Sequence, residues 1–395
     1  MKIHIPEGFF FAAASAGIKA SGRPDLAYAE AAGGANAAVL FTRNSVVGAP
    51  IDVMRASLKR SGGRVRALIV NSGNANCATG APGRKACERV CKETAALMKV
   101  RPAEVFASST GIIGVPLPVD KILKALPSLV ERKSAEEHAV RQFAQAIMTT
   151  DTQPKIASTR FLVGGRAISV LGVAKGAGMI HPNLATMLVY LFTDIGARPG
   201  ELRPLLKRVC DETFNCISID HDTSTNDTVL LLAGGASGVA LGRVSRDFND
   251  ALRLVCASLA EQIVSDGEGV AHVARLHVEG ARDRKEALTI AKAIAGSMLV
   301  KTALAGSDPN WGRILAAVGH SGVEVDPARV NIFIGPQQVC RHGQAHAFDE
   351  VAAHHYLSQP SYDIRVQLGR GKAAIDFLTS DLTAEYVRIN ADYST

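Results

Sequence analysis

Residues 176–188 read Gly-Ala-Gly-Met-Ile-His-Pro-Asn-Leu-Ala-Thr-Met-Leu, and the rest of the chain is organised around this stretch. Two glycines and a proline prevent regular structure in its first half, because glycine tolerates positive φ and proline cannot donate a hydrogen bond to a neighbouring strand. From Met187 onward the chain becomes apolar and aromatic, which predicts a buried strand. Thr186 therefore lies where an irregular loop enters a sheet, a junction at which reactive groups are often placed.

Thr186 has two interpretations on this stretch alone. A threonine at the start of a strand is most often a β-branched structural residue whose hydroxyl is satisfied locally. The other interpretation is a nucleophile, and the small Ala185 before it would leave its carbonyl carbon open to attack. The other motifs of the chain are needed to choose between a structural threonine and a nucleophile.

The composition is that of a globular protein large enough for two lobes. Hydrophobic residues make up 47% of the 395 positions, and nothing suggests disorder. Lys and Arg exceed Asp and Glu by seven, but the basic residues are scattered and do not form the stripe that nucleic-acid binding requires. We therefore expect no nucleic-acid partner and attribute the excess charge to solubility and a mild attraction for carboxylate substrates.

The seven cysteines show no metal-ligand spacing, and Cys87 and Cys91 form their only close pair. Reduced thiols in a cytoplasmic protein are the expected state. No secretory signal and no apolar run of membrane-spanning length is recognisable, so we expect neither export nor a membrane span.

Short strands and helices alternate along the chain, which predicts layered α/β or α+β packing. A Ser-Ala-Glu-Glu capping box at residue 134 predicts the start of a helix, and Gly164-Gly165 predicts a two-residue hairpin turn. The other helices are expected over 82–98, 201–211, 250–264 and 285–300. Strands are expected over 37–42, 67–71, 105–107, 160–163, 166–173 and 187–192.

Three loops carry residue types that can build a functional site. Residues 71–76 read Asn-Ser-Gly-Asn-Ala-Asn, either a tight turn or a backbone frame beside an active site. Thr110 and Gly111 follow a predicted strand, where a hydroxyl and a free backbone N–H can point into one space, as an oxyanion hole requires. Glu268 lies between two glycines and is either an exposed turn residue or a ligand contact. Each signal is weak by itself.

Two further motifs do not indicate a bound ion or nucleotide. Residues 220–228 contain three aspartates but lack the glycine and terminal glutamate of an EF-hand, so local turns and caps explain them better than a metal. Residues 369–372, Gly-Arg-Gly-Lys, lack the glycine spacing of a P-loop. We expect neither a metal nor a cofactor.

Taken together, the motifs resemble the ornithine acetyltransferase family, the glutamate N-acetyltransferases of arginine biosynthesis. The small departures from the family pattern are Ala177, Leu184 and His221, and none replaces a residue expected to do chemistry. The resemblance spans essentially the whole chain and rests on residues 16–19, 71–76, 109–114, 149–152, 175–188, 222–228, 266–269, 308–313 and 390–395.

The resemblance also implies the site residues. The chain is expected to cut itself between Ala185 and Thr186, which frees Thr186 as an N-terminal nucleophile, while Thr110 and Gly111 form the oxyanion hole. The implied substrate-binding residues are Thr149, Lys175, Thr186, Glu268, Asn390 and Thr395.

The implied reaction is a ping-pong transfer of acetyl from N-acetyl-L-ornithine to L-glutamate through an acetyl ester on Thr186. The freed α-amine, with an unperturbed pKa of about 7.7–8.0, can take the hydroxyl proton without a His or Asp partner. The sequence leaves open whether acetyl-CoA is a second donor, which would make the enzyme bifunctional. The alternatives are an aminopeptidase or amidohydrolase of the same fold, which passes the acyl group to water, and a non-catalytic binding protein.

The fold implied by the resemblance is α+β, a four-layer αββα sandwich shared with self-processing aminopeptidases. Residues 1–185 and 186–395 would be the α and β chains after cleavage. Because both chains would build one intertwined fold, the cut is not expected to be a domain boundary. The chains are expected to pair into an α2β2 heterotetramer.

Overall fold

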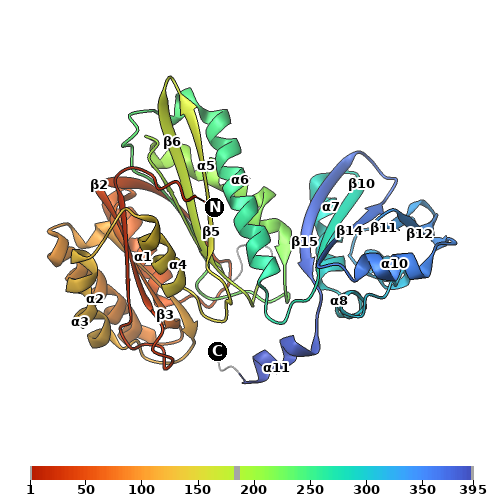
Figure 1. Cartoon of the computed structure of the whole chain (residues 1–395), viewed down its shortest axis with the longest axis horizontal. Coiled ribbons are helices and arrows are strands. Elements are labelled where there is room, and N and C mark those ends of the chain that lie inside the picture. The colour runs from red at the N-terminus through yellow and green to blue at the C-terminus, as the bar shows by residue number, and fades with distance from the viewer. Residues whose placement is uncertain (1, 182–186, 393–395) are drawn as a thin grey trace.

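The computed structural model of the chain describes residues 2–181 and 187–392 (Figure 1). The expected cleavage residues Ala185 and Thr186, and Thr395 at the C-terminus, lie outside the described residues. The chain forms two lobes, one around an eight-stranded sheet and one around a seven-stranded sheet.

The first sheet has the strand order β4-β3-β2-β9-β7-β6-β5, and β1 pairs with β2 outside this path. The hairpin predicted around Gly164-Gly165 is present between β5 and β6. The strands are β1 (Phe9–Ala14), β2 (Leu26–Phe41), β3 (Arg64–Asn74), β4 (Val105–Ile112), β5 (Lys155–Val163), β6 (Arg166–Lys175), β7 (Leu188–Thr193) and β9 (Thr228–Ala233).

A bend in β2 folds this sheet onto itself. The first half of β2 pairs with β1 and β3, its second half pairs with β9, and the register with β3 shifts between Glu30 and Ala35. Gly34 lies at this shift with a φ of +77°, a conformation that glycine adopts at little cost. The strands on the two sides of the bend therefore form two layers.

The alternation of side chains along the strands shows that these two layers face each other. Tyr190 and Phe192 of β7 point into the same core as Phe9 and Phe11 of β1, whereas Leu191 points into the core on the opposite face. The ring of Phe192 lies 5.3 Å from that of Phe9 and 5.0 Å from that of Phe11, in edge-to-face contacts. Successive residues of a strand point to opposite faces, so each layer also has an outer face to cover.

Helices cover both outer faces. The layer of β1, β3 and β4 carries α1 (Ala49–Ser61), α2 (Gly80–Met98) and α3 (Val119–Glu131). The layer of β5, β6, β7 and β9 carries α5 (Pro199–Glu212) and α6 (Ser245–Ser265). A further helix, α4 (Glu137–Ala146), contributes Phe143 to the core between the layers. The predicted α+β fold with an αββα sandwich is confirmed.

The segments before and after residues 182–186 are interleaved in the first sheet. β7 and β9, which follow these residues, lie between β2 and β6, which precede them. Backbone hydrogen bonds join β6 to β7 and β2 to β9. Two chains produced by a cut at 185–186 would therefore share one hydrogen-bonded sheet.

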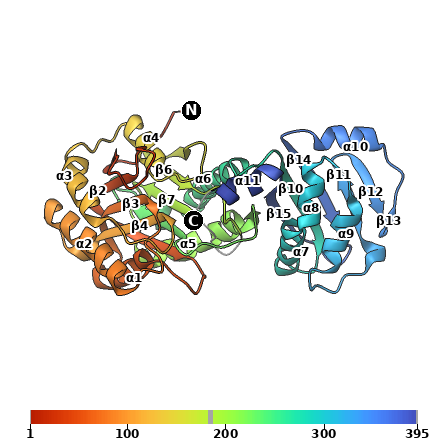
Figure 2. The same ribbon diagram turned by 90° about the horizontal axis from the view of Figure 1, so that it is seen from below.

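The second lobe has its own hydrophobic core and stands beside the sandwich (Figures 1 and 2). Its sheet has the order β13-β12-β11-β14-β10-β15-β8, and α11 (Ala384–Asp392) leads back from it toward the first lobe. Its strands are β8 (Ile217–Ser218), β10 (Val273–Ala281), β11 (Asn331–Ile334), β12 (Gln337–Arg341), β13 (Gln344–Ala345), β14 (Ser361–Gln367) and β15 (Ala373–Ser380). Its helices are α7 (Arg284–Gly296), α8 (Met298–Ala305), α9 (Trp311–Gly319) and α10 (Glu350–Leu357).

Two local predictions were wrong. The helix expected over 285–300 is interrupted at Ser297, whose side chain accepts a hydrogen bond from the Val300 N–H and so caps α8 instead of continuing α7. The capping box at Ser134 does not open a helix. The backbone of Ser134 exchanges two hydrogen bonds with Phe11 of β1, at 2.8 and 2.9 Å, and α4 begins at Glu137. In both places a serine makes a hydrogen bond that the periodicity of the sequence does not predict: Ser297 caps the next helix, and Ser134 bonds to a strand distant in the sequence.

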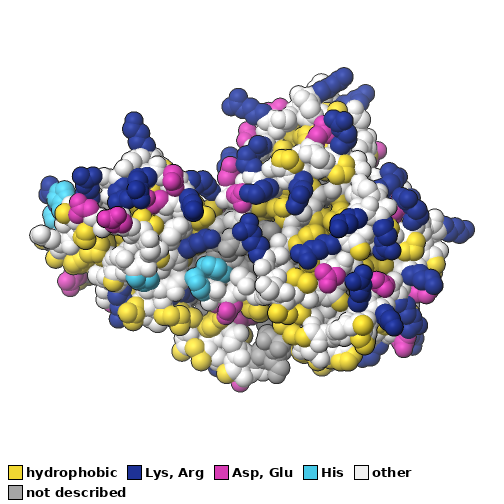
Figure 3. All heavy atoms as spheres, turned by 180° about the vertical axis from the view of Figure 1, so that it is seen from behind, with side chains coloured by type: hydrophobic (Ala, Val, Ile, Leu, Met, Phe, Trp, Pro, Cys, Tyr) yellow, Lys and Arg dark blue, Asp and Glu magenta, His cyan; other side chains and the backbone are white. Residues whose placement is uncertain are grey.

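The basic residues are scattered over the surface, as the sequence predicts, and the hydrophobicity of the helices and the state of the cysteines can be compared with the sequence as well. On the face in Figure 3, Lys and Arg side chains are spread over both lobes among apolar and acidic groups. Within the described part of the chain, no single helix is long and apolar enough to cross a membrane, although α7 and α8, which are bent against each other, together have sufficient length and apolar composition. All seven cysteines are free and buried.

The two-layer core gives a stability prediction. Replacing Phe192 with Ala should lower the free energy of unfolding by about 3–5 kcal/mol, because the ring fills the space between the layers. Leu162→Ala on β5 is the control, since Leu162 is 70% exposed, and should change stability by no more than about 0.5 kcal/mol. Urea denaturation followed by circular dichroism measures both, and equal losses would contradict the layered core.

Candidate active site

A narrow cleft collects those predicted site residues that the structure describes. Its walls come from the ends of β3, β4 and β6, the loops after α4, before β9 and after α6, and from α11. Met179, in the segment that leads toward Thr186, also lines it. The predicted residues that line the cleft are Thr110, Gly111, Thr149, Lys175, Glu268 and Asn390.

The loops at the ends of β3 and β4 are shaped by close backbone approach and side-chain hydrogen bonds. Gly111 has a φ of +127°, and a Cβ there would lie 2.4 Å from the carbonyl carbon of Gly73. The Asn71 amide donates to the Asn74 carbonyl oxygen at 2.8 Å, and Ser109 Oγ donates to Asn71 Oδ1 at 2.6 Å. Residues 71–76 are therefore a frame that holds the strand end carrying Gly111, and not a turn alone.

Asn226 ties this frame to the loop before β9. Its Nδ2 donates to the carbonyl oxygens of Ala75 at 2.6 Å and Ser109 at 2.8 Å. A Cβ on Gly48 would lie 1.8 Å from Asn226 Oδ1, so glycine at that position leaves room for the amide. The aspartate-rich stretch 220–228 thus positions the cleft, and among the described residues no group of three His, Cys, Asp or Glu side chains could hold a metal.

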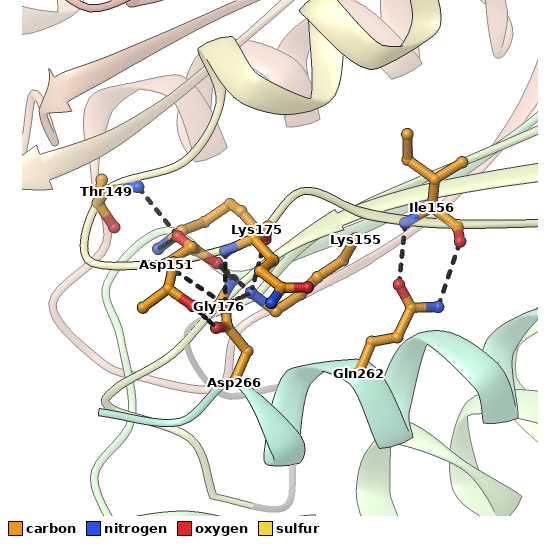
Figure 4. A network of polar contacts seen from close by, with 10 residues as sticks. Thr149, Asp151, Lys155, Ile156, Lys175, Gly176, Gln262 and Asp266 are labelled. Carbon is orange, nitrogen blue, oxygen red and sulfur yellow. Dashed lines mark hydrogen bonds and ion pairs between the residues drawn. The ribbon is translucent and has the colours of Figure 1, made fainter. Parts of the chain in front are cut away.

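A buried carboxylate organises the wall behind the cleft (Figure 4). Asp151 is fully buried and accepts hydrogen bonds from the backbone N–H groups of Thr149 at 2.9 Å and Gly176 at 2.7 Å. It also accepts one from Lys155 Nζ at 2.7 Å. One side chain therefore fixes both the loop of Thr149 and the backbone next to Lys175.

Two lysines share this carboxylate. Lys155, only 2% exposed, also donates to Asp266 at 2.5 Å, and Lys175 Nζ lies 4.0 Å from Asp151. Burial opposes ionisation of Asp151, but Lys175 and Lys155 together hold its pKa below the usual range. Burial lowers the pKa of Lys175, and Asp151 acts in the opposite direction. Lys175 is thus held beside the cleft by the carboxylate of Asp151, which also pairs with Lys155.

The C-terminal helix completes one wall of the cleft. Asn390 Nδ2 donates to Glu268 Oε2 at 2.8 Å, and Tyr386 OH donates to Asp220 at 3.2 Å. A Cβ on Gly269 would lie 2.4 Å from the Tyr386 nitrogen. The glycine after Glu268 therefore lets α11 approach closely enough for Asn390 to orient that carboxylate.

Asp220 holds the segment that leads toward Thr186. Its carboxylate accepts from the backbone N–H groups of Met179 at 2.5 Å and Ile180 at 2.8 Å. Met179 has a φ of +56°, an uncommon value for a residue with a side chain. Burial raises the pKa of Asp220 to about 6. Two backbone hydrogen bonds to one carboxylate therefore fix the turn at Met179 and Ile180, on the N-terminal side of the expected cleavage residues.

Sequence reasoning missed three residues that hold the site together. Asp220 and Asn226 stand in a dense run of Asp, Asn and Thr, so their composition signalled side-chain to backbone bonding. Lys155 pairs with Asp151 four residues earlier, but its second partner, Asp266, lies 111 residues away along the chain, so the sequence did not show that this lysine joins the two carboxylates.

The chain is thus an αββα sandwich with a cleft in which a strand end shaped by Gly111 meets the buried Lys175, an arrangement that suits an enzyme of acyl transfer. Its place among known proteins follows from the whole sequence. The chain belongs to the ArgJ family, which matches residues 10–395. The family expected from the motifs is therefore confirmed.

Two curated relatives align with this chain over nearly its full length. The arginine biosynthesis bifunctional protein ArgJ of Methylococcus capsulatus is 44% identical over 98% of this chain and 95% of its own. The protein of the same name from Thermus thermophilus is 44% identical over 100% of both. A crystal structure of ArgJ from Bacillus halodurans is similar at 40% identity with a TM-score of 0.50, and covers 52% of this chain and 98% of the solved chain.

The close contact at Gly111 gives an activity prediction. Gly111→Ala should lower acetyl transfer by on the order of 10²–10³, because the methyl group would push β4 away from Gly73 and displace Thr110 and Gly111, which the motifs predict as oxyanion donors. Gly114→Ala is the matched control, since Gly114 also has a positive φ of +83° but nothing lies within 4 Å of its Cβ position. Steady-state rates of both variants test this, and equal losses would attribute the effect to backbone strain alone.

The buried ion pairs give a stability prediction. Lys155→Met should lower the free energy of unfolding by about 3–5 kcal/mol, because Asp151 and Asp266 would lose a buried cation. Lys207→Met is the matched control, since Lys207 pairs with Asp211 at the same four-residue spacing but is 62% exposed. It should cost no more than about 1 kcal/mol. Denaturant midpoints measure both, and a Lys155 variant as stable as the control would contradict the network.

Proposed function

We propose that the chain transfers an acetyl group from N-acetyl-L-ornithine to L-glutamate through an ester on Thr186, as a glutamate N-acetyltransferase of arginine biosynthesis. The observation that supports this is the meeting of separate motifs at one place. Residues from seven separate segments of the chain, all singled out by motif, line one cleft beside the segment that leads to Thr186. Family membership over residues 10–395 supports the same reaction.

Self-cleavage would prepare the nucleophile. The Thr186 hydroxyl oxygen adds to the carbonyl carbon of Ala185, the C–N bond between the two residues breaks, and the Thr186 nitrogen leaves with a proton. Water then hydrolyses the ester, which leaves a carboxylate on Ala185 and a free α-amine on Thr186. Asp220 supports this step by fixing the turn before the bond, and the strained φ of Met179 is typical of such sites.

Turnover would use the same groups twice. The α-amine takes the proton of the Thr186 hydroxyl as its oxygen attacks the acetyl carbonyl, and ornithine leaves with a proton from that amine. The amine of glutamate then attacks the acetyl ester and regenerates the hydroxyl. In both halves, Thr110 and Gly111 would donate hydrogen bonds to the oxyanion, a contribution of about 10²–10³ per donor.

The charges of the cleft suit these substrates. Lys175 would bind the α-carboxylate that donor and acceptor share. Glu268, oriented by Asn390, would bind the side-chain ammonium of the donor. Thr149 and Thr395 would complete the substrate contacts.

The assembly would consist of two chains of each kind, α2β2, in the cytoplasm. The interleaved strands of the first sheet support chains that stay together after cleavage. The solved Bacillus halodurans chain is itself about half as long as this one, by its coverage of 52% against 98%. Seven buried, free cysteines support a reducing compartment.

A hydrolase of the same fold is the second candidate, and family membership argues against it. Acetyl-CoA as an additional donor is proposed because the relatives carry the name bifunctional. The thioester of acetyl-CoA would acetylate the same threonine. The identity of the acetyl donor and the identity of the acceptor, glutamate or water, therefore distinguish these possibilities.

An intact-mass spectrum tests the mechanism. The purified protein should appear as two chains divided at 185/186, the second of which gains one acetyl group with N-acetylornithine or acetyl-CoA and loses it to glutamate. Thr186→Ala should abolish both cleavage and the adduct, because the nucleophile is gone. An uncut, fully active Thr186→Ala variant would contradict the mechanism, and glutamate-independent release of acetate would favour the hydrolase.

A further inference from the structure

A second, larger cavity adjoins the cleft, and none of the roles predicted from the motifs accounts for it. It has a volume of about 640 Å³ and shares Thr149 with the cleft. Ile112, the residue after Gly111, and Asp151 of the buried network also line it. A substrate held at the oxyanion loop could therefore extend into this cavity.

The cavity contains two cations, Lys19 and Arg23. The stem of Lys19 packs on the oxyanion frame, because its Cγ is 3.0 Å from the position of a Cβ on Gly73, and Gly73 is the strand partner of Gly111. Lys19 Nζ donates to the Pro24 carbonyl oxygen at 2.9 Å, which orients the ammonium. Lys19 thus places a positive charge in the cavity, beside the strand ends that carry Gly73 and Gly111.

The carboxylates near Lys19 are occupied by other donors. Asp25 accepts from the backbone N–H groups of Ala16, Ile18 and Lys19 itself, and so anchors the loop and not the ammonium. Asp151 is bonded as described above. Within the described ranges, Lys19 makes no ion pair within 4.0 Å. Burial lowers its pKa to about 8, against the opposing effects of Asp25 and Asp151, so most of it remains charged at neutral pH.

The two substrates pose a problem that one anionic contact cannot solve. The donor side chain ends in an ammonium group and the acceptor side chain in a carboxylate, yet Glu268 can attract only the first. The described residues that line the cleft and the cavity include three cations, Lys19, Arg23 and Lys175. Lys175 is taken by the shared α-carboxylate, and Arg23 is exposed.

We propose that Lys19, with Arg23 at the rim, binds the γ-carboxylate of glutamate and makes this cavity an acceptor-specific subsite. The inference rests on the proposed function and extends it. The donor would direct its side chain toward Glu268 and the acceptor toward Lys19, so that each half-reaction uses its own side-chain contact.

Separate measurement of the two half-reactions tests this subsite. Lys19→Met should form the acetyl-enzyme from N-acetylornithine at an unchanged rate, because the donor does not use Lys19. Transfer from the isolated acetyl-enzyme to glutamate should fall by about tenfold or more in kcat/KM, mainly through KM. The preference for glutamate over glutamine should shrink as well, which a merely structural role would not cause.

Three further variants complete the test. Lys19→Arg should recover most of the glutamate preference, and Lys19→Gln gives an independent neutral variant of polar character. Lys121→Met is the matched control, because Lys121 donates to Gly17 of the same loop at 2.6 Å but does not line the cavity. It should change neither half-reaction.

Each failure has a distinct signature. Normal acetyl-enzyme formation with unchanged use of glutamate by Lys19→Met and Lys19→Gln would overturn this inference and leave the proposed function standing. Equal losses in both half-reactions would also overturn it. Absence of an acetyl-enzyme in the unaltered protein would overturn both.

Discussion

The buried carboxylate of Asp151 is the interaction on which the site depends. A fully buried carboxylate is stable only when its oxygens are paired and hydrogen-bonded, and here two backbone N–H groups and a lysine satisfy it. Through these bonds the loop after α4, the start of β5 and the end of β6 meet at one point. Asp266 adds the end of α6 through Lys155. The position of Lys175 beside the cleft follows from this arrangement.

The bend in β2 supplies the second constraint. It turns one continuous sheet into two facing layers, whose inner core is filled by aromatic rings from both. The strands on either side of the expected cut then lie side by side in the same sheet. A chain built in this way can lose one peptide bond at 185–186 without losing the hydrogen bonds that hold the halves together.

Glycine explains why separate segments can meet so closely at the cleft. The positions at Gly111, Gly48 and Gly269 each face a backbone or side-chain atom that a Cβ would displace. Their neighbours, Thr110, Asn226 and Asn390, could not reach their observed places otherwise. The same closeness lets the stem of Lys19 pack against Gly73, the strand partner of Gly111, where the adjoining cavity meets the cleft.

The sequence by itself determined the layered class, the positions of six of the eight strands in the first sheet, the family and the residues expected at the cleft. These follow from local periodicity, from turn chemistry and from motifs that keep their order along the chain. It did not give the break at Ser297, the use of Ser134 by β1, or the roles of Lys155, Asp220 and Lys19. Those were decided by tertiary structure, because each depends on a partner distant in sequence or on the competition between a local cap and a continued helix. The role of a buried charged side chain depends on the hydrogen-bond partners and counter-ions around it, and only the folded chain brings these groups together.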